Sequence, residues 1–129
     1  MPTRAQQRFE NLKNAAEALG RTVTIENPSE AERGGLIQFF EVAFELSWKT
    51  LKDLMEEKGT LIPAPRDVLK QAFQDGLVQD GHVWLKALEK RNLTTHIYDQ
   101  ILAKTMEDQI KKEFNPAIQA LVTHLKTLL

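Results

Sequence analysis

Apolar residues recur every three to four positions along most of this chain, which is the spacing of one face of an α-helix. A β-branched stretch, residues 21–29, is too short and too isolated to indicate a sheet. The helix expected over 29–58 is apolar around so much of its circumference that it should be central or shared with a partner subunit. The expected helices are, in chain order, 4–19, 29–58, 65–75, 81–92, 95–113 and a last amphipathic segment that reaches Leu129. The pattern therefore predicts an all-α bundle with short connections.

Turn and capping residues indicate where these helices begin and end. Gly20 is expected to stop the first helix, and Ser29 is expected to begin the second, because its side chain can accept a backbone N–H at the N-cap. Asp80 and Thr95 are the corresponding candidates for the fourth and fifth helices. Pro116 is expected to break or kink the fifth helix, since proline has no N–H to donate to the helical hydrogen bonds.

Composition and charge narrow the class of protein. The chain fits one domain, 1–129, and its 27% of charged residues is ordinary for a soluble protein. With 17 basic and 18 acidic residues the net charge is −1, which gives no overall argument for nucleic-acid binding but is compatible with a local basic cleft. The chain has no cysteine and no apolar run near the ~18 residues that cross a membrane, so we expect a soluble, cytoplasmic protein without a thiolate metal site.

The polar stretch "KRNLTTHIYDQ", residues 90–100, interrupts the helical pattern and contains the only tyrosine of the chain. In an unbroken helix, Arg91 and His96 would lie five residues and about 140° apart around the axis, so they would not share a face. The paired threonines Thr94 and Thr95 have modest helix propensity and are good N-cap residues, which favours a break here. A break would let the guanidinium and the imidazole reach one ligand.

Arginine and histidine together suit a metal-free cleavage of RNA. Arginine presents planar, permanently charged donors that match phosphate oxygens, and a neutral histidine exchanges a proton near pH 7. The histidine would act on the 2′-hydroxyl or on the leaving oxygen, while the arginine stabilises charge on the phosphoryl group. The structural alternative is that Arg91 ends the fourth helix, Thr95 caps the fifth, and His96 is an ordinary polar residue.

Three further residues near the motif could contribute to a site. Asp80 and Trp84 precede it on the expected fourth helix and could line its cleft, although apolar spacing favours a core or dimer-interface position for Trp84. His96 and Asp99 are close enough in the chain to touch one metal ion, but two ligands do not make a metal site. We therefore expect neither a metal nor a cofactor.

The stretch "RNLTTHIYD" resembles the Arg-x4-His-x-Tyr motif of the HEPN superfamily, with a polar residue, Asn92, directly after the arginine. The longer stretches "RFENLKNAAEAL", "FFEVAFELSWKTLKDLMEEKG" and "PRDVLKQAFQDGLVQDGHVWLKALEKRNLTTHIYD" resemble, in the same order, the HepT-like group, which is also called the nucleotidyltransferase substrate-binding family. This resemblance covers most of residues 8–110. It implies an antiparallel up-and-down bundle of four main helices plus a short extra helix, which pairs as a homodimer.

The resemblance also implies a function and a partner. HepT-like proteins act as toxins of toxin–antitoxin pairs: they are metal-independent ribonucleases, which a minimal nucleotidyltransferase silences by adding AMP to the motif tyrosine (AMPylation). Carried onto this chain, the catalytic pair would be Arg91 and His96, and the modified residue would be Tyr98. The accessory polar positions would be Asn92, Thr95 and Asp99. The older name of the family leaves an alternative, a non-catalytic subunit that binds a substrate or nucleotide for the nucleotidyltransferase.

Overall fold

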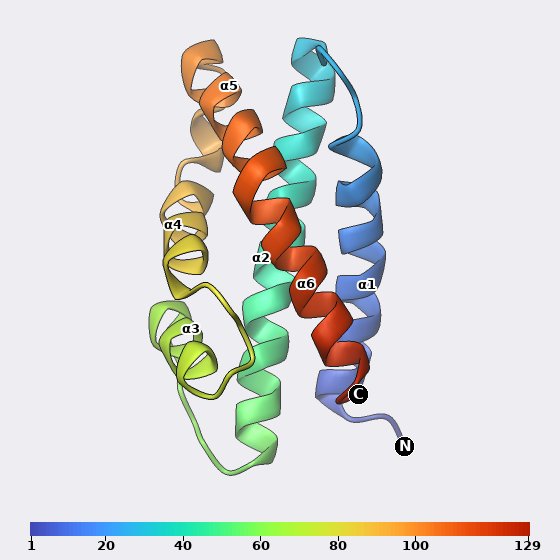
Figure 1. Ribbon diagram of the computed structural model, residues 1–129, viewed down its shortest axis with the longest axis vertical. Helices are drawn as coiled ribbons and strands as arrows, with labels where there is room; N and C mark the ends of the chain where they lie inside the picture. The colour runs from blue at the N-terminus through green and yellow to red at the C-terminus, as the bar shows by residue number, and fades with distance from the viewer.

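The computed structural model describes residues 1–129, and every regular element is helical (Figure 1). A bilayer-spanning helix, which needs about 20 mostly apolar residues, is not among them. The expected all-α fold is confirmed. In chain order the elements are α1 (Arg4–Thr22), α2 (Glu30–Glu57), α3 (Pro65–Gln74), α4 (Gly81–Arg91), the 3-10 turn η1 (Thr94–His96), α5 (Gln100–Gln109), the π-helical turn η2 (Ile110–Phe114) and α6 (Asn115–Lys126).

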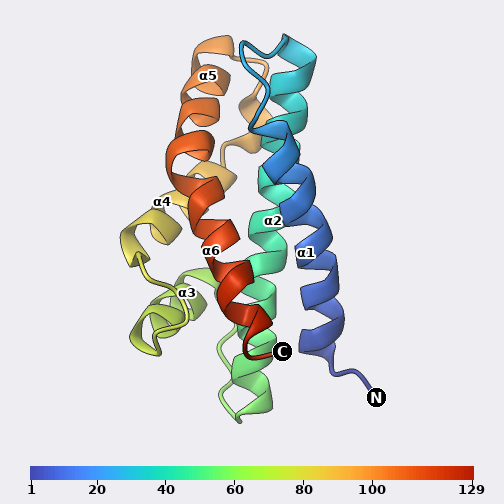
Figure 2. The same ribbon diagram turned by 45° about the vertical axis from the view of Figure 1, so that its right-hand side comes forward.

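The helices alternate in direction along the chain, which confirms the up-and-down topology. In Figure 1, α1 runs upward from the N-terminus, α2 runs downward, α4 runs upward, and α5 with α6 runs downward to the C-terminus. Helices α1 and α2 pack side by side, and α6 packs against both of them (Figure 2). The shorter helices α3 and α4 pack against each other and cover another side of α2.

Helix α2 is the centre of the bundle, as its apolar circumference predicts. It packs against α1, α3, α4, α5 and α6. The Phe40 ring stacks on Phe114 of η2 with 5.2 Å between ring centroids, and the Phe44 ring lies 6.0 Å from that of Trp84 on α4. These aromatic contacts attach to α2 the elements on both sides of the polar motif, so the motif is held by the main core of the protein.

The first helix does not end at Gly20 as expected but continues to Thr22. Gly20 lies inside α1 and faces α6: an added Cβ would lie 3.4 Å from Nε2 of Gln119, an ordinary van der Waals distance, and this amide donates a hydrogen bond to the Ala16 carbonyl at 2.8 Å. The chain turns later, at Asn27, whose φ of 49° lies in the left-handed region. The prediction was wrong because a single glycine inside a helix costs only about 1 kcal/mol, which the packing of the helix can offset.

The fifth helix begins later than expected. It starts at Gln100, and its N-cap is Asp99 rather than Thr95. Oδ1 of Asp99 accepts hydrogen bonds from the backbone N–H groups of Ile101 at 3.0 Å and Leu102 at 3.2 Å. Thr95 and Asp99 are both residue types that cap helices, but aspartate is the stronger of the two at an N-cap. Thr95 instead lies within the 3-10 turn that precedes the helix.

Pro116 was expected to break or kink the helix; the helix is not broken there, but it is distorted directly before the proline. Helices α5, η2 and α6 follow one another without interruption, and the Asn115 N–H donates to the Ile110 carbonyl five residues back, which widens the helix into a π-helical turn. This turn leaves Pro116 in the first positions of α6, where a missing N–H is tolerated. The last predicted segment is buried through Ile118, Leu121, Val122 and Leu125.

Candidate functional site

The polar motif forms a short joint between α4 and α5. Arg91 is the last residue of α4, and the turn η1 separates it from α5. The buried Thr94 hydroxyl donates to the Arg91 carbonyl at 3.0 Å, which holds the turn against the helix end. The Ile97 side chain packs beside Gly34 of α2, where an added Cβ would lie 3.8 Å from Cδ1 of the isoleucine. The helix is therefore broken at the motif, as the two threonines predict.

Arg91 pairs with Glu45 from the middle of α2. Nε of the arginine lies 3.0 Å from Oε1 of the glutamate, and the two side chains are 26% and 25% exposed. These two atoms nevertheless form no hydrogen bond, so the contact is an ion pair in which the N–H does not point at the oxygen. The second oxygen of Glu45, Oε2, accepts a hydrogen bond from Nε1 of Trp48 at 3.0 Å. One edge of the guanidinium is thus held by a carboxylate that is itself anchored.

His96 and Tyr98 form an exposed pair at the surface of the joint. Nδ1 of His96 lies 3.2 Å from the Tyr98 hydroxyl, and the ring centroids are 5.9 Å apart in an edge-to-face arrangement. Either the phenol donates to Nδ1, or Nδ1–H donates to the phenol oxygen, and both arrangements leave Nε2 outside the contact. Tyr98 is 75% exposed. The imidazole and the phenol are therefore accessible to a large substrate or to a modifying enzyme.

Arg91 and His96 make no direct contact within one chain. The arginine is engaged by Glu45, whereas the histidine pairs with Tyr98. The sequence predicts that a break in the helix lets the two side chains reach one ligand, and the break itself is present. Their convergence stays a prediction, which concerns the protein with its substrate or with a second copy of the chain.

The three accessory positions lie at the surface of the same joint. Asn92 directly follows α4, and Thr95 lies within η1, and both side chains are exposed. Asp99 is also exposed, but its carboxylate is used by two backbone N–H groups at the start of α5. In the single chain, Asn92 and Thr95 are thus open to a ligand, while Asp99 begins the next helix. Catalytic roles for these three residues stay predictions.

Asp80 and Trp84 do not lie at the motif in the single chain. The Trp84 ring is 2% exposed and packs against Phe44, so the core position favoured by its apolar spacing is the one observed. Asp80 caps α4, where Oδ1 accepts from the Val83 N–H at 3.2 Å. This cap is at the opposite end of α4 from Arg91. A cleft at the motif is therefore not lined by Trp84, because its ring is enclosed by the bundle.

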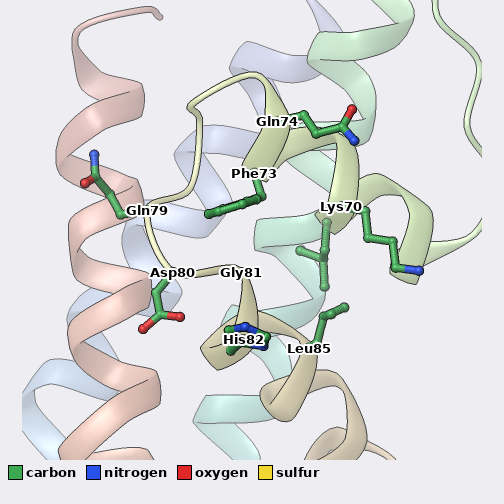
Figure 3. Close-up of a pocket in the computed structure, with 9 residues that line it drawn as sticks. Lys70, Phe73, Gln74, Gln79, Asp80, Gly81, His82 and Leu85 are labelled. Carbon is green, nitrogen blue, oxygen red and sulfur yellow. The ribbon is translucent and has the colours of Figure 1, made fainter.

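A separate hollow of about 440 Å³ lies between α3 and the start of α4 (Figure 3). The Phe73 ring forms one wall and lies so close to Gly81 that an added Cβ would be 3.2 Å from it. In the close-up, Lys70 and Gln74 point away from His82, so the polar groups around the hollow do not converge. No group of three or more His, Asp or Glu side chains in the chain is arranged to hold a metal ion.

Sequence reasoning did not identify Glu45, the partner of Arg91. A signal was present, because Glu45 and Trp48 are three residues apart and share a face of the long helix, and a buried indole N–H needs an acceptor. The spacing cannot indicate that the end of α4 reaches this part of α2, since that contact joins residues far apart in the chain. The tertiary structure was needed to bring the arginine into the same cluster.

The fold and the motif together define a class: an all-α bundle in which an arginine ends one helix and an exposed histidine–tyrosine pair follows the break before the next helix. The chain belongs to the family of nucleotidyltransferase substrate binding protein like proteins, whose family model matches residues 7–127. This match covers nearly the whole chain, and it confirms the family expected from the sequence.

Named relatives agree with this assignment. A Haemophilus influenzae protein named probable ribonuclease HepT is 33% identical over 81 residues, which is 59% of this chain, and the match spans 56% of that relative's length. A solved H. influenzae structure, reported to reveal the fold of a substrate binding domain of a nucleotidyltransferase, is 28% identical with a TM-score of 0.82, over 92% of this chain and 98% of that chain. A solved Thermus thermophilus protein is 29% identical with a TM-score of 0.75, over 90% and 96% of the two chains.

Proposed function

We propose that this chain is a HepT-like ribonuclease, the toxin of a toxin–antitoxin pair, and that it acts as a cytoplasmic homodimer. A partner minimal nucleotidyltransferase would silence it by adding AMP to Tyr98. The observation that carries the proposal is the exposed pair of His96 and Tyr98, which follows Arg91 across a helix break in a chain similar to a probable ribonuclease. Cleavage of a large, negatively charged substrate requires an accessible imidazole and a cation that meet at one phosphate, and the proposal assigns these roles to His96 and Arg91.

The proposed reaction uses the ribose of the RNA as its own nucleophile. His96 removes the proton of the 2′-hydroxyl, the 2′-oxygen bonds to phosphorus, and the bond from phosphorus to the 5′-oxygen breaks. The 5′-oxygen takes a proton from a second histidine, so the products are a 2′,3′-cyclic phosphate and a 5′-hydroxyl. Arg91 stabilises the negative charge on the phosphoryl oxygens. No step needs a metal ion.

A homodimer would supply the second histidine. In a two-fold dimer, Arg91 and His96 of both chains come to one cleft if the joint lies at the symmetry axis. Elements around the joint carry exposed apolar side chains, namely Phe39 and Val42 on α2 and Ile101 at the start of α5. Exposed apolar groups of this kind are typical of an interaction surface. These exposed side chains support the proposed dimer.

AMPylation of Tyr98 would directly affect the neighbouring His96. The Tyr98 oxygen would attack the α-phosphorus of ATP, and the bond from that phosphorus to the pyrophosphate leaving group would break. The product has no phenolic O–H, and it carries a negative phosphodiester next to a ring nitrogen that now lies 3.2 Å from the tyrosine oxygen. This charge would repel the phosphate of an RNA substrate and disturb His96. The 75% exposure of Tyr98 supports access by a second enzyme.

The toxin function is tested by expressing the chain without its partner. Wild type should arrest growth and cleave RNA, and Arg91→Ala or His96→Ala should relieve the arrest at an unchanged protein level. Asn11→Ala, an exposed change on α1 away from the joint, is the matched control and should remain toxic. If wild-type protein, shown by intact mass to be unmodified at Tyr98, is harmless and cleaves no RNA, the proposal fails.

The partnership is tested by mass spectrometry. Protein made together with the nucleotidyltransferase should gain the mass of one or more AMP groups, and Tyr98→Phe should abolish the gain. Modification of Tyr98→Phe at the same level as wild type would exclude Tyr98 as the acceptor. This measurement does not depend on RNA cleavage, so it separates the regulatory part of the proposal from the catalytic part.

A second candidate function is a non-catalytic subunit that presents a substrate or nucleotide to the nucleotidyltransferase. The observation that favours it is the pairing of Arg91 with Glu45, which occupies part of the guanidinium and leaves it without contact to His96. This function predicts nucleotide binding in calorimetry without RNA cleavage, whereas the ribonuclease predicts cleavage that His96→Ala abolishes. Parallel calorimetric and cleavage assays on the unmodified protein distinguish the two functions.

A further inference from the structure

Glu45 forms an ion pair with the guanidinium group of Arg91 at its Nε atom. Nε of the arginine lies 3.0 Å from Oε1 of the glutamate, and no hydrogen bond within the chain uses Nη1 or Nη2. The outer nitrogens are therefore available to phosphate oxygens, which arginine binds with two donors at once. The ion pair restrains the base of the guanidinium and leaves its outer end open.

Glu45 is itself fixed by its neighbours on α2. Its second oxygen accepts the Trp48 indole N–H at 3.0 Å, and Trp48 is a buried residue of the core. Nζ of Lys49 lies 3.9 Å from the same oxygen and 5.8 Å from the centre of the Trp48 ring. A carboxylate whose two oxygens have different partners has a defined orientation, and it passes that orientation to the group it pairs with.

We propose that Glu45, anchored by Trp48, is a positioning residue that orients Arg91 toward the phosphate of the substrate. This inference rests on the proposed ribonuclease function. The bent geometry of the ion pair restrains the guanidinium through charge, without a linear hydrogen bond that would have to break when the arginine adjusts to a phosphate. Because Arg91 and Lys49 contribute two positive charges and Glu45 one negative charge, the cluster keeps an attraction for anions.

Glu45→Gln is the informative change, because it keeps the shape of the side chain and removes the charge. A displacement of a catalytic group by about 1 Å costs about a hundredfold in rate. We therefore expect kcat for RNA cleavage to fall by about ten- to hundredfold, with KM changed by less than about threefold, since many other phosphate contacts bind a long RNA. Trp48→Phe, which removes the N–H and keeps an aromatic ring, should lower kcat by a smaller factor.

The matched control is Glu41→Gln, one helical turn before Glu45. Glu41 is partly buried on the same helix and makes no ion pair, so this variant loses the same charge without touching the arginine. Its kcat should equal that of wild type. In an Arg91→Ala background, Glu45→Gln should cause no further loss, because a positioning residue acts only through the group it positions. Circular dichroism checks that every variant remains folded.

A second measurement follows the orientation of Arg91 without any turnover. The Nε–Hε signal of Arg91 in side-chain NMR spectra, identified by its loss in Arg91→Lys, should be that of an ordered group in wild type and Glu41→Gln. It should become motionally averaged in Glu45→Gln. If Glu45 served only the stability of the fold, Glu45→Gln would lower the free energy of unfolding. It would not change the mobility of the Arg91 side chain, and it would not lower kcat selectively over KM.

Clear outcomes overturn the inference. Unchanged or raised kcat in Glu45→Gln would show that the glutamate is idle or restrains activity, and equal losses in Glu45→Gln and Glu41→Gln would show a general charge effect. An equally mobile Arg91 signal in wild type and Glu45→Gln would also refute the positioning role. If wild type cleaves no RNA, the proposed function fails, and the NMR comparison alone then decides whether Glu45 orients Arg91.

Discussion

Glu107 is the shared acceptor of a partly buried ion cluster that ties α2 and the α1–α2 loop to α5 and η2. Its Oε1 lies 2.7 Å from Nε of Arg33, and its Oε2 lies 2.8 Å from Nζ of Lys111, which also donates to the Ile25 carbonyl at 3.0 Å. Burial raises the pKa of the Glu107 carboxyl, but hydrogen bonds from Lys111 and Arg33 lower it, and the net pKa lies below the usual 4.5.

Glu107→Gln should destabilise the protein substantially. The amide oxygen can still accept from one cation, but the amide NH2 then faces the other, and Arg33, only 11% exposed, loses its counter-charge. A charge-assisted hydrogen bond contributes about 1.5–3 kcal/mol, and breaking a fully buried ion pair costs about 3–5 kcal/mol. Because this cluster is only partly buried, we expect a loss of about 2–3 kcal/mol in the free energy of unfolding. That corresponds to a fall in Tm of about 8–12 °C, at roughly 4 °C per kcal/mol for a chain of this size.

Urea unfolding followed by helical circular dichroism, at a fixed protein concentration, measures this loss. The matched control is Glu113→Gln, whose carboxylate pairs with Lys86 at 3.0 Å between side chains that are 34% and 44% exposed, so its loss should be below about 1 kcal/mol. Since the folded-state pKa of Glu107 is depressed, its stabilisation is present above the unfolded pKa and is lost as pH falls through the folded pKa. The difference between wild type and Glu107→Gln should therefore shrink below pH 4.5. Equal costs for the two variants, or a difference that does not shrink with acid, would refute the reasoning.

Three further predictions follow from the helix boundaries, the core and the proposed chemistry. Asp99→Ala should cost about 1 kcal/mol in urea unfolding by removing the N-cap of α5, whereas Thr95→Ala should change little; equal effects would exclude Asp99 as the cap. Trp84→Ala should cost about 3–5 kcal/mol through the cavity left beside Phe44, and Trp84→Phe clearly less; a small loss in the alanine variant would contradict the buried ring. RNA cleavage by the unmodified protein should continue unchanged in excess EDTA, because arginine and histidine alone supply the proposed chemistry, and rescue by an added divalent metal would contradict this.

Local signals predicted most helix boundaries correctly. The capping box formed by Ser29 and Glu32 is present with both of its hydrogen bonds, and Asp80 caps α4, because a cap depends on residues only three or four positions apart. The predictions failed where a local signal allowed two interpretations. Gly20 lies inside α1 instead of at its end, and at Thr95 a stronger capping residue follows within about one turn.

The candidate site was predicted in part for the same reason. Its motif residues are contiguous in the chain, so the helix break between Arg91 and His96 follows from a short stretch of sequence, whereas the contact of His96 with Tyr98 was seen only in the structure. The partner of the arginine, Glu45, could not be predicted, since it comes from a different helix. The same holds for Trp84, whose apolar spacing allowed a core or a dimer-interface position until the contact with Phe44 showed which one is occupied.

By itself the sequence determined that this protein is an all-α bundle, that a polar motif separates its fourth helix from its fifth, and to which family it belongs. Periodicity and capping are properties of neighbouring residues, so they can be recognised in the sequence without knowledge of the whole fold. Only the tertiary structure decided that Pro116 is absorbed by a π-helical turn and that Arg91 meets Glu45. The physical reason is that apolar spacing shows which face of a helix is buried, while the helix it packs against depends on how all the buried faces fit together in one core.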